Sequence, residues 1–150
     1  MGKAGIYKEL LLKAEGLLSA EPDLIAGLAN MSALIQETFH HHWTGFYLVK
    51  NNMLVLGPFQ GPVACTRIAY NKGVCGRAWA EKQSQVVEDV HRFEGHIACS
   101  PYSNSEIVVP VIKGDSVVAV LDIDSTAFSA FDEVDKIHLE QLCNRMSYLF

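Results

Sequence analysis

Three cysteines in the central third of the chain, Cys65, Cys75 and Cys99, stand among glycines, histidines and carboxylates and not on a repeating apolar stripe. A fourth, Cys143, lies on such a stripe near the C-terminus. A thiol within an apolar stripe packs as a small hydrophobic group, whereas a thiol in a polar loop can ionise and react. The pattern predicts thiol chemistry in the centre of the chain and a packing role for Cys143.

Each central cysteine has its own setting. Cys75 begins an expected helix, where free backbone N–H groups favour a thiolate, although a small packing residue fits that position equally well. Cys99 lies in a long irregular stretch near His91 and His96, and a histidinium there would activate its thiol. Cys65 precedes a short strand; it is either a packing residue at the strand edge or a thiol that traps a sulfenic acid as a disulfide.

A zinc site is a competing interpretation of the same residues. The three cysteines, with His91 or His96, would supply four ligands. No Cys-x-x-Cys pair is present and the gaps between the cysteines are wide. We therefore predict no metal.

Asp122 and Asp124 lie two residues apart in an expected strand, so they share one face and repel each other. Such a pair suits an ammonium ligand or a transferable proton, with a raised pKa on at least one carboxyl if the site is buried; a solvated strand end is the ordinary alternative. Glu106 joins them only if the hairpin around residues 114–115 has more than a simple two-residue loop. In that simple register Glu106 faces Ile123, whereas a longer loop or a bulge brings it beside the aspartates.

Trp43 and Tyr47, four residues apart in another expected strand, also share a face. They form either part of the core or an aromatic wall for a small apolar group.

The elements that must position these residues follow from the spacing of apolar side chains. Helices are expected over 6–18 and 24–39, a hairpin over 43–49 and 53–59, and a strand over 66–69. A helix over 74–81 and a strand at 86–87 precede an irregular stretch over 88–105. A second hairpin over 106–112 and 117–124 leads to a last helix with Asp132 as its N-cap. The apolar stripes place Leu17, Ile25 and Ile137 inward. This order predicts one α+β (α/β) domain with a mostly antiparallel sheet covered by helices.

Length and charge narrow the function further. The chain has 150 residues, which fits one domain over 1–150. Its formal net charge of −5 argues against a nucleic-acid surface, and no apolar run is long enough to cross a membrane. The first residues do not form a signal peptide, and several cysteines without an obvious pairing pattern suit the cytoplasm, which we predict as the location.

Five segments of the chain resemble free methionine-(R)-sulfoxide reductases, a family built on a single GAF domain. They are GVCG at 73–76, VEDV at 87–90, GHIAC at 95–99, SNSEIVVP at 103–110 and VLDIDS at 120–125. The resemblance extends from the first helix to the last. It implies an enzyme that reduces free methionine-(R)-sulfoxide, repairs oxidative damage, needs no cofactor and forms a homodimer.

The resemblance also implies roles for the cysteines. Cys99 would be the nucleophile that attacks the sulfoxide sulfur and becomes a sulfenic acid. Cys65 would resolve it as a Cys65–Cys99 disulfide, which thioredoxin then reduces. Cys75 would be an alternative or secondary catalytic thiol. The irregular stretch 88–105 would close over the site as a lid.

The remaining roles implied by the resemblance concern the substrate. Glu106, Asp122 and Asp124 would hold its ammonium group, and Glu106 or Asp124 would supply the proton that the sulfoxide oxygen needs. Trp43 and Tyr47 would contact the S-methyl end. The rival hypothesis is a GAF-type sensory module that binds a small ligand or reports redox state; the three cysteines and the acidic cluster favour the enzyme.

Overall fold

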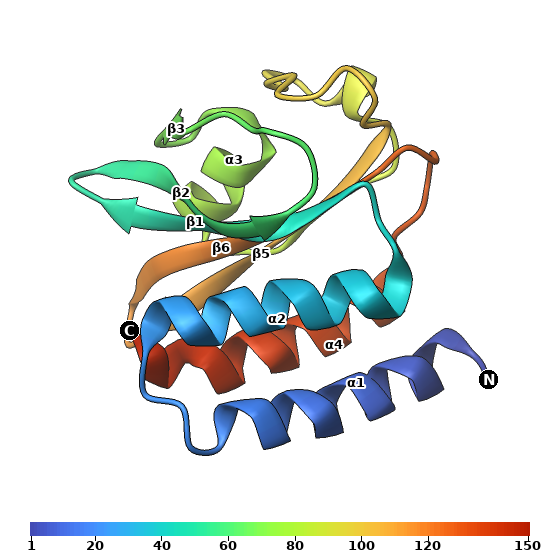
Figure 1. The fold of residues 1–150 in the computed structure, drawn as a ribbon. Coiled ribbons are helices and arrows are strands. Elements are labelled where there is room, and N and C mark those ends of the chain that lie inside the picture. Colours follow the sequence, from blue (N-terminus) through green and yellow to red (C-terminus); the bar gives the residue numbers. More distant parts are fainter.

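A six-stranded sheet runs through the middle of the molecule, with helices on both of its faces (Figure 1). The computed structural model describes residues 1–150. In chain order the elements are α1 (Lys3–Leu18), α2 (Leu24–Phe39), β1 (Trp43–Lys50), β2 (Met53–Gln60), β3 (Arg67–Ala69), α3 (Gly73–Glu81), β4 (Gln85–Val87), the 3₁₀ turn η1 (Val90–Arg92), β5 (Ser105–Lys113), β6 (Ser116–Ser125), α4 (Glu133–Met146) and the 3₁₀ turn η2 (Ser147–Leu149).

The strands lie in the order β3-β2-β1-β6-β5-β4, and every neighbouring pair is antiparallel. Helices α2 and α4 pack on one face of the sheet, with α1 against their outer side, and α3 lies on the other face with the segments 61–66 and 88–104 (Figure 1). The predicted α+β domain with a mostly antiparallel sheet is therefore confirmed.

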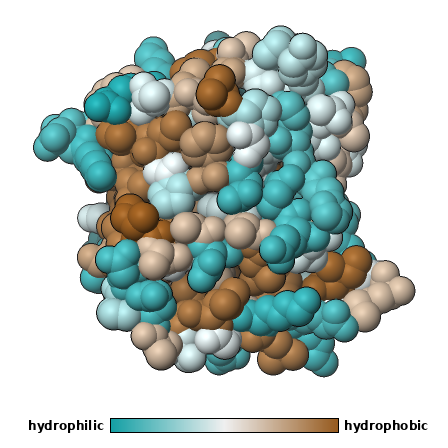
Figure 2. Space-filling model, viewed as in Figure 1, coloured by the Kyte–Doolittle hydropathy of each residue, from teal (hydrophilic) through white to brown (hydrophobic).

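Residues of β1 alternate between two cores, because successive side chains of a strand point to opposite faces. Phe46 and Leu48 belong to the large core under α1, α2 and α4. Trp43 and Tyr47 belong to the smaller core on the α3 side. Figure 2 shows hydrophobic residues at the surface among hydrophilic ones, over both the sheet and the helical layer. The α3 face is where the chemistry-bearing residues gather.

Turns and caps follow the expected local chemistry. Asn51 and Asn52 both have positive φ, as a tight two-residue hairpin turn requires, and they join β1 to β2 as predicted. The side chain of Asp132 accepts hydrogen bonds from two backbone N–H groups at the start of α4, within a capping box completed by Asp135. The predicted N-cap is confirmed.

The β5–β6 hairpin combines a two-residue loop with a bulge. Lys113 pairs with Ser116 across the turn, and the register shifts between Val111 and Ile112. The shift places Glu106 opposite Asp124 and not opposite Ile123. The bulge thus satisfies the condition, set by the sequence, for one shared acidic site.

Three side chains expected to point inward are exposed: Leu17 by 46%, Ile25 by 54% and Ile137 by 45%. In α4 the buried stripe contains Leu139 instead. Residues two positions apart in a helix are separated by roughly 200° of rotation. Ile137 therefore points away from the core that Leu139 enters. Leu17 and Ile25 lie at the edges of the stripes of α1 and α2.

Helix α1 is fixed to α4 by polar contacts as well as by apolar packing. The hydroxyl of Tyr7 donates to Asp135 at 2.6 Å, and the Lys3 ammonium lies 2.7 Å from the same buried carboxylate.

In the whole molecule, no helix has the length and apolar character needed to cross a membrane.

Candidate functional site

A row of functional side chains crosses three neighbouring strands on the α3 face of the sheet. Trp43 of β1 lies opposite Asp124 of β6, and Asp124 lies opposite Glu106 of β5. Asp122, two residues earlier on β6, lies opposite Gly45. The sheet therefore gathers the three carboxylates that the sequence singled out, together with the aromatic pair of β1.

Gly45 leaves room for this arrangement. It sits between Trp43 and Tyr47 on the same face of β1, and their rings stack over it with centroids 5.9 Å apart. A Cβ atom at this position would lie 2.7 Å from the Trp43 ring and would also collide with Phe59. Glycine thus allows Trp43 and Phe59 to pack closely against β1 at this point.

The space between α3, the sheet and the cysteine-bearing segments is a small cavity of about 40 Å³ that is partly open to solvent. Its lining contains all the predicted substrate-binding residues and two of the three central cysteines: Trp43, Tyr47, Cys75, Cys99, Glu106, Asp122 and Asp124. Two buried oxygen atoms in it, Asp122 Oδ1 and Ser103 Oγ, have no hydrogen-bond partner. Such unpaired buried atoms are uncommon, and these two can form hydrogen bonds with a molecule that enters the cavity.

Burial of the three carboxyls in one cluster raises the pKa of each of them. Burial and the negative charge of Asp122 raise the pKa of Glu106 well above its usual range, and they do the same to the pKa of Asp124. Burial also raises the pKa of Asp122, but hydrogen bonds from Glu106 and Cys75 oppose that rise. The negative charge is therefore best held by Asp122, and the proton by Glu106 or Asp124.

Cys75 completes this cluster as a neutral thiol. Ligand atoms of Cys75, Glu106 and Asp122 all lie within 4.8 Å of one another, close enough to surround one small cation. Burial and the charge of Asp122 raise the pKa of the Cys75 thiol well above its usual range. Of the two alternatives that the sequence left open for Cys75, this pKa direction favours the buried packing residue over a thiolate, because burial among carboxylates opposes the effect of the backbone N–H groups.

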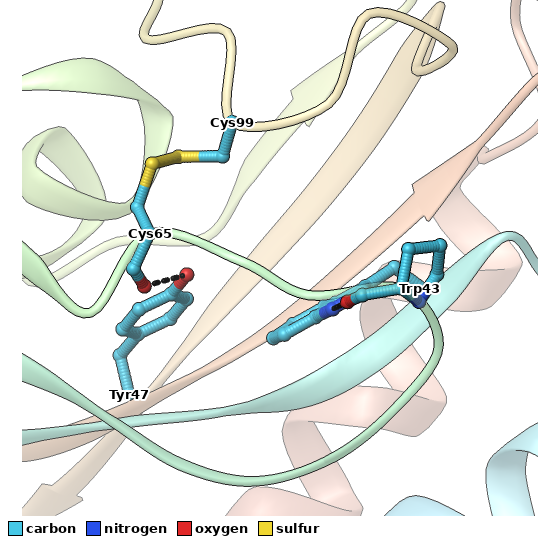
Figure 3. Close-up of a disulfide and its surroundings, with 5 residues drawn as sticks. Trp43, Tyr47, Cys65 and Cys99 are labelled. Atoms are coloured by element: carbon cyan, nitrogen blue, oxygen red, sulfur yellow. Dashed lines mark hydrogen bonds between the residues drawn. A yellow bond between two sulfur atoms is a disulfide. The ribbon is translucent and has the colours of Figure 1, made fainter.

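Cys65 and Cys99 form a disulfide with Cα atoms 5.5 Å apart, and both residues are partly exposed. The bond connects the irregular segments 61–66 and 93–104 above the cavity (Figure 3). Cys75 and Cys143 are free and buried. Cys143 packs in the large core beneath the other face of the sheet, as predicted.

Only one of the two histidines expected near Cys99 lines the cavity. This residue is His96, and burial together with the charge of His91 lowers its pKa, which disfavours the expected histidinium. His91 pairs through Nε2 with Asn104 Oδ1 at 2.9 Å and is not part of the cavity lining. Activation of Cys99 by a charged histidine is therefore not supported.

Several residues of the site were not singled out by the sequence. Lys72 and Ser103 line the cavity, and His42 Nε2 lies 3.0 Å from Ser100 Oγ, one residue after Cys99. Ser103 falls within the SNSEIVVP segment, and this was the sequence feature that could have identified it as a site residue. No sequence feature identified Lys72 or His42, because their positions depend on how the segments fold over the sheet.

The aromatic pair of β1 also has polar contacts that the sequence did not indicate. The indole N–H of Trp43 donates to the Pro62 carbonyl at 3.0 Å. The Tyr47 hydroxyl donates to the Cys65 carbonyl at 2.9 Å (Figure 3). Both acceptors belong to the segment that carries Cys65.

Known proteins resemble the chain over nearly its whole length. Residues 30–149 match the GAF domain family. GAF domain-containing protein A of Dictyostelium discoideum is 51% identical over 91% of this chain and 87% of its own. Free methionine-R-sulfoxide reductase of Escherichia coli K12 is 48% identical over 95% of this chain and 87% of its own. The X-ray structure of free methionine-R-sulfoxide reductase from Neisseria meningitidis in complex with its substrate is 45% identical, with a TM-score of 0.98 over 100% of this chain and 91% of that one.

Proposed function

This chain belongs to the GAF-domain family of free methionine-(R)-sulfoxide reductases, and we propose that it reduces free methionine-(R)-sulfoxide to methionine with its own cysteines. The observation that carries the proposal is the Cys65–Cys99 disulfide beside a cavity whose buried carboxyls hold both charge and protons. A thiol pair supplies the two electrons, and a protonated carboxyl supplies the proton that sulfoxide reduction requires.

The cavity suits each end of a free amino acid. The substrate ammonium would lie against Asp122, whose Oδ1 has no partner within the protein. Lys72, at the cavity wall, carries the charge that suits the substrate carboxylate. The stacked rings of Trp43 and Tyr47 form the apolar surface for the S-methyl end.

Chemistry begins on the reduced enzyme. The sulfur of Cys99 attacks the sulfoxide sulfur while Glu106 or Asp124 protonates the sulfoxide oxygen. The attack forms a bond between the two sulfur atoms and returns the thiol proton of Cys99 to the carboxyl. As this bond and the S–O bond of the substrate break, the hydroxyl passes to Cys99, which leaves methionine and a Cys99 sulfenic acid. The raised pKa of both carboxyls favours the protonated form that can donate this proton.

The cycle closes through the second cysteine. The Cys65 thiol attacks the sulfenic sulfur of Cys99, a disulfide forms, and the oxygen leaves as water. We propose that thioredoxin then reduces this disulfide. Val63 and Ile97, each two residues before one of the paired cysteines, are exposed apolar side chains that a protein reductant would cover. Opening of the segment 93–104 would then admit the next substrate.

Assembly and location complete the proposal. We propose a homodimer, because α1 leaves the apolar side chains of Leu12 and Leu17 exposed for a second copy to cover. We propose the cytoplasm as the location, because the cycle needs a reducing partner for the disulfide at every turnover.

One experiment tests the activity. The reduced protein is mixed with each free sulfoxide epimer and with a peptide-bound sulfoxide, first alone and then with thioredoxin, thioredoxin reductase and NADPH. We expect one equivalent of methionine from the free (R) epimer alone, and continuous NADPH oxidation with the reductase system. Binding of the (R) epimer without methionine formation would instead identify a sensory module.

A further inference from the structure

The segment that carries Cys65 has few contacts of its own. Residues 61–66 connect β2 to β3 without helix or strand. Their only backbone–backbone hydrogen bond runs from the Leu56 N–H to the Thr66 carbonyl at 3.1 Å. A segment with so little backbone pairing does not hold its shape by itself.

Side chains of β1 supply the missing ties. The Trp43 side chain donates a hydrogen bond to the Pro62 carbonyl, and the Tyr47 side chain donates one to the Cys65 carbonyl (Figure 3). Two donors from one strand therefore hold the segment at two points. Tyr47 is only 2% exposed, and its ring is fixed against Trp43. The tie at Cys65 therefore starts from a side chain with little freedom to move.

These ties matter most when the disulfide is absent. In the reduced enzyme, the bond between Cys65 and Cys99 no longer holds the two segments together. The Cys65 thiol must nevertheless meet the sulfenic sulfur of Cys99 quickly, before a further oxidant reaches it. Reactions of this kind depend on how well the two groups are positioned in advance.

We propose that Tyr47 is a positioning residue for the resolving step: its hydroxyl holds the Cys65 backbone so that the Cys65 thiol faces the sulfenic acid of Cys99. This inference rests on the proposed function and adds a second role to a residue whose ring lines the substrate cavity. Trp43 acts in the same way on Pro62, at the other end of the segment.

The hydroxyl of Tyr47 suits this task better than acid catalysis. A phenol has one hydrogen to donate, and the hydrogen of Tyr47 is directed to the Cys65 carbonyl. Burial and the nearby acidic cluster also raise its pKa, so the hydroxyl keeps its proton throughout the working range of pH. The tie is therefore constant while the carboxyls exchange protons.

The substitution Tyr47→Phe removes this hydroxyl and keeps the ring. The affected step joins Cys99–S–OH and HS–Cys65 into a disulfide and water. We expect Tyr47→Phe to slow this step about tenfold, equivalent to about 1.4 kcal/mol in its barrier. Release of methionine precedes this step and is measured separately, so the ratio of the two rates reports the resolving step even if the change also affects substrate binding.

The experiment follows one turnover of reduced enzyme with free methionine-(R)-sulfoxide. Rapid quenching measures methionine, a thiol titration measures disulfide formation, and dimedone traps the sulfenic acid. The matched control is Tyr148→Phe, because the Tyr148 hydroxyl also donates to backbone carbonyls, those of Leu18 and Glu21, at the junction of α1 and α2. We expect trapped sulfenic acid to accumulate in Tyr47→Phe and not in the control or the wild type.

Two outcomes would overturn the inference. Wild-type disulfide formation in Tyr47→Phe would show that the hydroxyl is not needed for positioning. A slower release of methionine with no separate delay in disulfide formation would place the hydroxyl in the reduction of the sulfoxide itself. If Tyr47→Phe does not fold, Trp43→Phe removes the donor to the Pro62 carbonyl at the other end of the segment. Because this change also alters the substrate wall, its disulfide formation is compared with its own methionine release, and a wild-type ratio would overturn the inference. A wild-type protein that releases no methionine would instead refute the proposed function.

Discussion

The substitution Asp122→Asn separates what the acidic cluster does for activity from what it does to stability. It keeps the shape of the side chain and removes the charge that best suits the substrate ammonium. Loss of one charge-assisted contact costs about 1.5–3 kcal/mol. We therefore expect kcat/KM for free methionine-(R)-sulfoxide to fall about 10- to 150-fold.

The same change should stabilise the folded protein. Oxygen atoms of Glu106 and Asp122 lie within 4.8 Å of each other. Two unit charges at that distance repel by about 3.5 kcal/mol at an effective dielectric constant of about 20. Partial protonation already relieves some of this repulsion in the wild type, so we expect Asp122→Asn to gain about 1–3 kcal/mol in the free energy of unfolding at pH 7.

The gain should depend on pH in a defined direction. In the unfolded chain, Glu106 and Asp124 lose their protons near pH 4, at about their ordinary pKa values. Because their pKa values are raised in the folded state, the folded protein holds more protons above that pH. Stability then falls by about 1.4 kcal/mol per pH unit for each proton retained, until the folded group also ionises. Removing the charge of Asp122 lowers both raised pKa values, so the fall should end at a lower pH.

Urea denaturation between pH 4 and 8, combined with steady-state kinetics, measures both effects. The matched control is Asp115→Asn, which neutralises an exposed carboxylate at the turn of the same hairpin. It should change neither the slope of stability against pH nor kcat/KM. An Asp122→Asn protein that is less stable than the wild type at pH 7, or that keeps wild-type kcat/KM, would refute this account of the cluster.

Three further predictions use other parts of the molecule. Cys99→Ser should abolish methionine formation, while Cys143→Ser should keep it and affect only stability, as methionine release and thermal unfolding will show. The disulfide closes a loop of 34 residues and should add about 4 kcal/mol to the free energy of unfolding. In calorimetry, the oxidised protein should therefore melt about 8–16 °C above the reduced protein. Equal melting temperatures would contradict this expectation. Lys72→Met should raise KM about threefold to fivefold with little change in kcat, because a partly solvated charge contributes no more than about 1 kcal/mol; an unchanged KM would remove Lys72 from the site.

The acidic site shows how much of a site the spacing of residues in the sequence can predict. Asp122 and Asp124 share a face in any straight strand, so their proximity followed from the sequence. Glu106 belongs to another strand, and its place depended on the register of the β5–β6 hairpin. The sequence could state the condition, a longer loop or a bulge, but the choice between them depends on how Val111 and Ile112 pack against the helices.

Cys75 shows a different limit. Its position at the start of a helix was read correctly, and the local effect there does favour a thiolate. The thiol is nevertheless neutral, because the fold buries it beside Glu106 and Asp122. A local motif indicates only the electrostatic effect of its own helix or strand. The pKa of the Cys75 thiol also depends on groups that are distant in sequence and that only the tertiary structure brings close.

Selectivity for a free amino acid follows from the same burial. A methionine sulfoxide within a peptide has no ammonium group, so it would leave Asp122 Oδ1 unpaired in the cavity. An unpaired buried charge is costly, and the peptide chain would also have to pass the segments joined by Cys65 and Cys99. A site that hydrogen-bonds one group of its substrate rejects analogues without it far more strongly than an apolar pocket rejects a change of size. The acidic cluster, which we expect to destabilise the protein without substrate, would therefore be the feature that makes the enzyme specific.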